Sequence, residues 1–260
     1  MKLDYRVAQY ISWLSIAVSG LAALLMFTWP LFIQTASQNE ANLAQTVFVI
    51  LMPLLLILVL VEFATGGIGS KQLAILGVLT ALNAVIRLLG AGTAGIETVF
   101  FIVILGAYVF GSSFGFILGS ASLLVSALLS GGFGPWLPFQ MMAAGLVGLV
   151  AGLLYKPKAL RWQLGWLVSY GVLASFVYGG LMTFWNWPFL AGIGSSVSYV
   201  AGGGILENLT RFIQYELLTG GLLWDLGRAV TTSALLLVTA PALLSTLRRA
   251  ASKAGFETFR

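Results

Sequence analysis

Residues 46–64 read TVFVILMPLLLILVLVEFA, and this apolar stretch decides the fold class. It contains one charged residue, Glu62, and approaches the roughly 20 apolar residues that a helix needs to cross the hydrocarbon core of a bilayer. The whole chain of 260 residues shares this character, with 59% hydrophobic residues, 8% charged residues and a mean hydropathy of +1.00. Soluble domains carry about 25% charged residues. The sequence therefore predicts an all-α, polytopic membrane helix bundle.

Similar apolar stretches recur along the chain, and they predict about eight spans, with seven or nine as alternatives. The spans lie near residues 11–33, 46–64, 72–90, 96–110, 115–130, 139–155, 162–184 and 216–247.

Lysine and arginine residues indicate which side of the membrane each connection faces. With an even number of spans, all of the 13 basic residues fall on one side except Arg87, Arg211 and Arg228. Basic residues accumulate on the cytoplasmic side, so we expect a multi-pass protein of the inner (plasma) membrane with both termini in the cytoplasm. The formal charge of +5 then reflects topology, and we expect no nucleic-acid partner.

The residue types that the chain lacks exclude several kinds of chemistry. It has no histidine and no cysteine, which rules out a serine–histidine triad, a cysteine nucleophile, a disulfide and a thiolate metal site. Residues 66–71 (GGIGSK) lack the ending of a phosphate-binding loop, so no ATP site is expected. We expect no enzyme activity, no metal site and no cofactor bound by this chain.

Small residues at four-residue spacing predict close helix contacts, because helices in lipid associate through backbone approach. Two stripes of this kind are expected to hold the protein's own helices together. They are Gly111, Gly115 and Gly119, and Ala144, Gly148 and Gly152. The third span carries a shorter set, Gly77, Thr80, Ala81 and Ala84, for which internal packing and docking of another subunit are both open.

Charged side chains within a membrane are costly, so each one suggests a function and a partner. Arg87 and Glu97 flank a short glycine-rich turn and can pair, and Asp225 and Arg228 are three residues apart on one helix. Joining helix ends and binding a solute are equally open interpretations of each pair. The charged residues at or just beneath the predicted outer face are Arg87, Glu97, Glu207, Arg211, Glu216, Asp225 and Arg228.

Aromatic residues accompany these charges in two proline-containing connections, residues 131–139 (GGFGPWLPF) and 184–189 (FWNWPF). Tyr215 and Trp224 lie beside the charges near the last span. A pocket with aromatic walls and a few polar groups suits a small amphiphilic solute, although Trp and Tyr are also common interfacial anchors. The connection at residues 191–208 is rich in glycine and serine and is expected to be either a lid or a disordered loop.

Taken as a set, these segments resemble a known family, the substrate-binding S components of energy-coupling factor (ECF) vitamin transporters, in a longer bacterial subgroup. The resemblance covers roughly residues 72–250. It is carried by residues 90–98 (GAGTAGIET), the glycines from Gly111 to Gly119, residues 131–140 (GGFGPWLPFQ), 184–189 and 224–229 (WDLGRA).

The resemblance implies a six-helix S-component-like core at residues 71–250, two additional N-terminal transmembrane helices at residues 1–70, and a basic cytoplasmic tail at residues 251–260. It also implies a transmembrane coupling subunit and two cytoplasmic ATPases as partners, so that ATP is used by the partner subunits. The family's docking groove on the first core helix corresponds to the small residues of the third span, where two alanines do not stand at the usual spacing. These partner-binding residues are Gly77, Thr80, Ala81 and Ala84.

The solute implied by the resemblance is a vitamin or related micronutrient bound near the outer face, with cobalamin or another corrinoid as the lead. A stand-alone secondary transporter and a membrane scaffold protein are the alternatives. The expected substrate-binding residues are Arg87, Glu97, Phe133, Trp136, Phe139, Gln140, Trp185, Asn186, Trp187, Tyr215, Trp224, Asp225 and Arg228.

Overall fold

The computed structural model describes residues 5–32, 38–65, 69–90, 95–190, 195–219 and 221–256, and every regular element in these ranges is a helix. The all-α prediction is thus confirmed for the described part of the chain. The helices are α1 (Tyr5–Phe27), α2 (Trp29–Phe32), α3 (Gln38–Thr65), α4 (Ser70–Gly90), α5 (Val99–Phe110), α6 (Ser112–Ser130), α7 (Leu137–Gly152), α8 (Leu160–Phe184), α9 (Trp187–Leu190), α10 (Ile205–Thr219) and α11 (Gly221–Ala254).

Five helices of the described ranges are long and apolar enough to cross a membrane. They are Leu43–Val61 within α3, and α4, α6, α8 and α11. Three shorter apolar helices are Ala17–Phe27 within α1, α5 and α7. The predicted start of the last span at residue 216 is wrong, because α10 ends at Thr219 and α11 begins at Gly221. Glu216 therefore belongs to a separate helix.

The centre of the bundle is α5. All of its residues except Val109 are buried, and they form the main hydrophobic core with side chains from the surrounding helices. Gly111 separates α5 from α6 with a φ of 99°, a conformation that glycine adopts without steric cost. Gly111 is therefore needed for the backbone conformation of the turn. Its Cα does not face a close neighbour, because a Cβ added to it would meet open space.

Helices α6 and α7 approach each other at backbone distance. A Cβ built on Gly148 would collide with the carbonyl oxygen of Gly115, and one built on Gly119 would collide with the carbonyl oxygen of Ala144. A Cβ on Gly152 would strike the backbone of Ser112. The prediction that these two stripes hold the protein's own helices together is confirmed, with Gly111 as the exception.

The N-terminal helices α1 and α3 pack side by side and contact α6 and α7. The ring of Phe27 meets the edge of Phe139, with centroids 5.4 Å apart, and Phe63 lies 5.2 Å from Phe116. These aromatic contacts make the N-terminal pair continuous with the hydrophobic core.

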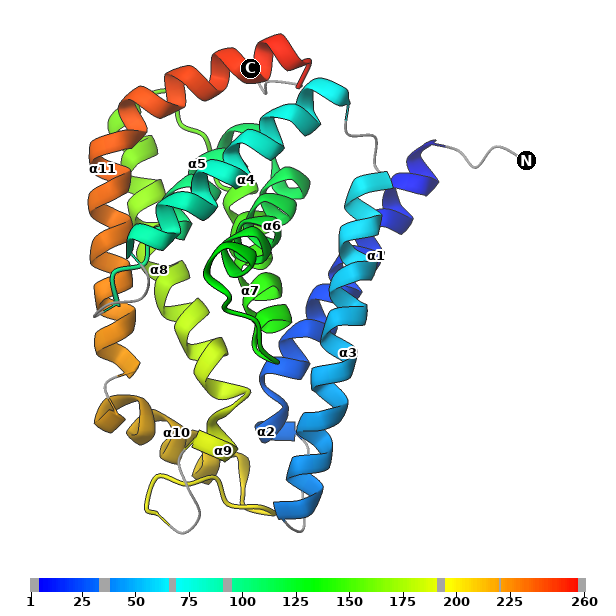
Figure 1. The fold of residues 1–260 in the computed structure, drawn as a ribbon, viewed down its shortest axis with the longest axis vertical. Coiled ribbons are helices and arrows are strands. Elements are labelled where there is room, and N and C mark those ends of the chain that lie inside the picture. The colour runs from blue at the N-terminus through cyan, green and yellow to red at the C-terminus, as the bar shows by residue number, and fades with distance from the viewer. Residues whose placement is uncertain are drawn as a thin grey trace.

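Figure 1 shows the start of α1 and the end of α11 at the upper end of the molecule, and α2, α9 and α10 at the lower end. The upper part of α11 bends across the bundle (Figure 1). Pro241 lies inside this helix and explains the bend, because proline removes one backbone hydrogen bond and its ring crowds the preceding turn. The lower end holds the groups described next.

Candidate functional site

One ion pair of the site joins α4 to the segment before α5. Arg87 lies in the last turn of α4, and its Nε atom is 3.3 Å from a carboxylate oxygen of Glu97. The same guanidinium donates a hydrogen bond of 2.8 Å to the hydroxyl of Ser126 on α6. The Arg87 and Glu97 side chains are 21% and 12% exposed. Arg87 and Glu97 therefore form the ion pair that the short turn between them suggests, and this pair is largely shielded from solvent.

The other ion pair lies on α11 and faces α8. Arg228 donates hydrogen bonds to the carboxylate of Asp225 and, over 3.2 Å, to the carbonyl oxygen of Ser175. The Asp225 carboxylate lies directly on Gly179 of α8, where any Cβ would collide with it. Glycine at 179 is therefore required for α11 to bring this carboxylate into the bundle.

Tyr178 of α8 lies against the ion pair of α11. The guanidinium carbon of Arg228 is 5.1 Å from the centroid of its ring, a cation–π distance, and the ring of Phe100 meets it edge to face at 4.9 Å. The charges of Glu97, Arg228 and Arg87 all act on the Tyr178 hydroxyl. We call Arg87, Glu97, Asp225 and Arg228, grouped around Tyr178, the charge cluster.

An apolar cavity of about 220 Å³, open to the surface on one side, lies between α1, α7 and α8, and Tyr178 of the charge cluster is one of its lining residues. Its walls include Leu24, Val147, Val177 and Tyr178. Tyr170 also lines it, but its hydroxyl donates to the carbonyl oxygen of Val147 and is not available to a ligand. Tyr178 belongs to both features, so a mainly apolar void and a set of shielded charges meet at one side chain.

Glu216, near the end of α10, adds a further acidic group beside the charge cluster. Its side chain is buried, and no lysine or arginine among the described residues forms an ion pair with it; its nearest donor is the hydroxyl of Thr183. A Cβ on Gly221 would collide with this carboxylate, which places it at the junction of α10 and α11. Burial raises the pKa of the Glu216 carboxyl above its ordinary value; Thr183 and Arg228 oppose the rise and Asp225 adds to it.

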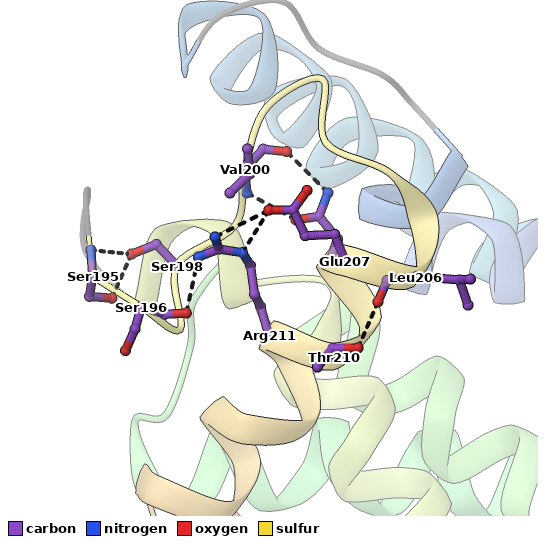
Figure 2. Close-up of polar contacts among 9 residues, drawn as sticks. Ser195, Ser196, Ser198, Val200, Leu206, Glu207, Thr210 and Arg211 are labelled. Atoms are coloured by element: carbon purple, nitrogen blue, oxygen red, sulfur yellow. Dashed lines mark hydrogen bonds and ion pairs between the residues drawn. The ribbon is translucent and has the colours of Figure 1, made fainter.

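The connection before α10 is folded against that helix. Asn208 accepts a hydrogen bond from the backbone N–H of Val200 and donates one to its carbonyl oxygen, at 2.9 and 3.0 Å. Figure 2 shows Arg211 reaching back to the carbonyl oxygen of Ser196 while it pairs with Glu207. Residues 195–204 are thus attached to α10 and are not a disordered loop; residues 191–194 of the predicted lid lie outside the described residues.

Replacing Asn208 with alanine is expected to release this connection from α10. The change leaves the backbone N–H of Val200 without its partner, at a cost of about 1–3 kcal/mol, whereas the carbonyl oxygen of Val200 keeps its hydrogen bond from the N–H of Gly203. We expect faster proteolysis within residues 195–204 and a lower melting temperature in detergent. Thr210→Ala is the matched control, because the Thr210 hydroxyl bonds only to Leu206 of the same helix (Figure 2). Equal proteolysis of the two variants would contradict this role of Asn208.

A model of the ECF transporter substrate-specific component family matches residues 71–223 of the chain, which is more than half of its length. The chain belongs to this family. No curated protein and no solved structure matches the chain. The matched region begins at the start of α4 and includes Arg87 and Arg211. Asp225 and Arg228 lie just after its end.

The aromatic residues predicted for the solute site of this substrate-specific component fall into two groups. Phe139, Trp185 and Trp187 are buried, and Phe139 stacks on Trp185 with ring centroids 4.0 Å apart. Trp29 donates its indole N–H to the carbonyl oxygen of Trp185, so the N-terminal helices cover this stack. Exposed aromatic side chains form the other group: Phe133, Trp136 and Trp224.

The three remaining predicted residues are half-buried at the same end of the substrate-specific component. Asn186 accepts a hydrogen bond of 2.9 Å from Gln45 of α3, and Tyr215 packs against the aromatic cluster around Trp187. Gln140 lies in the first turn of α7. The structure therefore brings together the four predicted charged residues, and it distributes the predicted aromatic residues over the core and the surface.

The small residues of α4 divide between two faces of the helix. Gly77 and Ala81 are exposed, and a Cβ added to Gly77 would meet nothing within 4 Å. Thr80 and Ala84 are buried within the bundle. In this substrate-specific component, only Gly77 and Ala81 of the predicted docking set are accessible to another subunit.

Tyr178, Ser175 and Gly179 of α8 contact the charge cluster but were not among the predicted site residues. Gly171, Ser175 and Gly179 follow one another at four-residue spacing, the same small-residue pattern that identified the α6–α7 contact. Gly171 and Gly179 both lie against side chains of α11. This pattern would have found the α8–α11 contact and the tyrosine beside it. In the described part of the substrate-specific component, no group of three or more acidic residues could hold a metal ion.

Proposed function

We propose that this chain binds a small organic micronutrient at the end of the bundle that carries the charge cluster, and delivers it together with a transmembrane coupling subunit and two cytoplasmic ATPases. The partners use ATP, and the chain itself binds no cofactor. The observation that supports this most strongly is the meeting of an apolar cavity with two shielded ion pairs at Tyr178. Ligand sites combine apolar walls with a few placed polar groups in this way.

We propose that all eight apolar helices cross the inner (plasma) membrane, with both termini in the cytoplasm. The distribution of lysine and arginine supports this orientation. Residues 1–70 then form two additional N-terminal membrane helices, residues 71–250 the substrate-binding core, and residues 251–260 a basic cytoplasmic tail. Residues 257–260 of that tail lie outside the described residues.

The size of the cavity favours a solute smaller than a corrinoid. Its volume of about 220 Å³ lies below the roughly 300–1,000 Å³ typical of ligand pockets. Cobalamin, the lead from the family resemblance, would therefore require α1 to move away from α7 and α8, which form the other walls of the cavity. A vitamin of one or two rings fits this proposal better.

Two measurements on the purified chain test the proposed function. Calorimetric titration with a panel of vitamins should give tight binding of one solute by the chain alone. Proteoliposomes should then take up this solute only when the coupling subunit and ATPases are also present and ATP is supplied. Uptake by the chain alone would indicate a stand-alone transporter, and an absence of any binding would favour a membrane scaffold.

Enlarging the exposed small residues of α4 should separate solute binding from transport. Gly77→Leu and Ala81→Leu add bulk to an open face, so we expect unchanged solute affinity and at least a tenfold loss of uptake with the complete transporter. Gly165→Leu on α8 is the control, because a Cβ there also meets open space. Full uptake by the α4 variants would exclude this face as the docking surface.

A further inference from the structure

The arginines and acidic residues of α10 and the charge cluster do not balance. Each of the three arginines there has one acidic partner: Arg87 with Glu97, Arg211 with Glu207, and Arg228 with Asp225. Glu216 lies beside these pairs without an arginine of its own. The nearby residues 91–94, 191–194 and 220, which the structure does not describe, contain no lysine or arginine.

The Glu216 carboxylate is shielded from water as well as unpaired. Only 6% of the residue is exposed, its nearest donor is the neutral hydroxyl of Thr183, and no lysine or arginine within the described ranges forms an ion pair with it. A buried carboxylate in this state is costly unless a cation or a strong hydrogen-bond donor reaches it. Burial raises the pKa of this carboxyl, so a proton competes with a cation for the site.

We infer that the solute carries a positively charged nitrogen, and that Glu216 is the residue that binds it. This inference rests on the proposed function and names the chemical class of its solute. The aromatic ring of Tyr178 and the cavity beside it would hold the apolar part of such a molecule. Within the Arg87–Glu97 and Asp225–Arg228 pairs the opposite charges cancel, so these pairs would position the solute through hydrogen bonds. The carboxylate of Glu216 would then be the group that attracts the positive charge of the solute.

A cationic solute competes with the proton for the Glu216 carboxylate, so the affinity for this solute depends on pH. Because the carboxyl pKa is raised, lowering the pH fills the site with protons and weakens binding of a permanently charged probe, whereas raising the pH strengthens it. The charged groups that act on Glu216 from α11 are Asp225 and Arg228, and Tyr215 is the titratable neighbour on α10. The described residues of α2 and α9 contain no charged side chain.

The test compares permanently charged and neutral probes by calorimetry with the full-length chain in detergent. Thiamine and benzyltrimethylammonium are the cationic probes, riboflavin is the neutral probe and biotin is the anionic probe. We expect a cationic probe to bind, and Glu216→Gln to weaken that binding at least tenfold and remove its pH dependence. Glu207→Gln is the matched control, because Glu207 is a 48% exposed carboxylate on the same helix.

The melting temperature distinguishes recognition from a structural role. Glu216→Gln replaces a buried carboxyl with an uncharged amide of similar shape, so the solute-free variant should melt at the same temperature as the wild type or higher. Tight binding of riboflavin or biotin that Glu216→Gln leaves unchanged would overturn the inference and leave the proposed function standing. A vitamin panel in which nothing binds would contradict the proposed function and this inference together.

Discussion

Replacing Gly148 with leucine is expected to abolish folding of the bundle. The Cα of Gly148 lies against the carbonyl oxygen of Gly115, and the opposing group is backbone that cannot rotate away. Overpacking a core costs about 1–3 kcal/mol even where side chains can adjust, and we expect more here because α6 and α7 must separate. The measurement is the yield of monodisperse protein after detergent extraction, followed by thermal unfolding.

Gly180→Leu is the control for this change, since Gly180 is also a helical glycine but a Cβ there meets nothing within 4 Å. We expect it to yield protein with a melting temperature close to that of the wild type. If Gly148→Leu also gave stable, monodisperse protein, the close contact of α6 with α7 would be wrong.

Replacing Arg228 with alanine should have the largest effect on the site itself. The change leaves Asp225, which is 5% exposed, as a shielded carboxylate without its partner. Removing one member of a buried ion pair costs about 3–5 kcal/mol, because the remaining charge is uncompensated. We expect a large drop in melting temperature and a loss of solute affinity of about 100-fold or more.

The double variant Asp225→Asn with Arg228→Gln separates stability from binding. It removes both charges and retains two polar side chains of similar shape, so most of the lost stability should return. Solute affinity should stay low, because the cation–π contact with Tyr178 and the hydrogen bond to Ser175 are also lost. Recovery of both properties in the double variant would show that the pair only joins α8 to α11.

The sequence was sufficient for the membrane-length helices and for the two small-residue stripes at which helices of this protein pack closely, but not for which helices meet there. Apolar stretches of membrane length have few alternatives to a helix, and glycines at four-residue spacing mark close backbone approach. The same reasoning failed at residue 216, because leucine and isoleucine continue through α10 and hide its end at Thr219. An amphipathic helix on the bundle end and the first turn of a span have similar hydropathy.

The charged residues of the candidate site could be selected from the sequence, but the residues that line the cavity could not. Arg87, Glu97, Asp225 and Arg228 stand out in sequence because charged residues are rare in this chain. The sequence alone did not distinguish Trp185 from a tryptophan that anchors the protein at the membrane interface. In the structure, α1 and α2, which lie far from it in sequence, bury this side chain. Which aromatic side chains face a cavity depends on such long-range packing, and one sequence contains no record of it.

The most direct test of the account locates the bound solute. The chain has no cysteine, so a single Val177→Cys substitution places one reactive thiol in the cavity wall beside Tyr178. Val238→Cys on α11 is the control, because Val238 is 79% exposed and lies outside the cavity. We predict that saturating solute slows N-ethylmaleimide modification at position 177 at least several-fold and leaves position 238 unaffected. Equal modification rates at position 177 with and without bound solute would contradict the account.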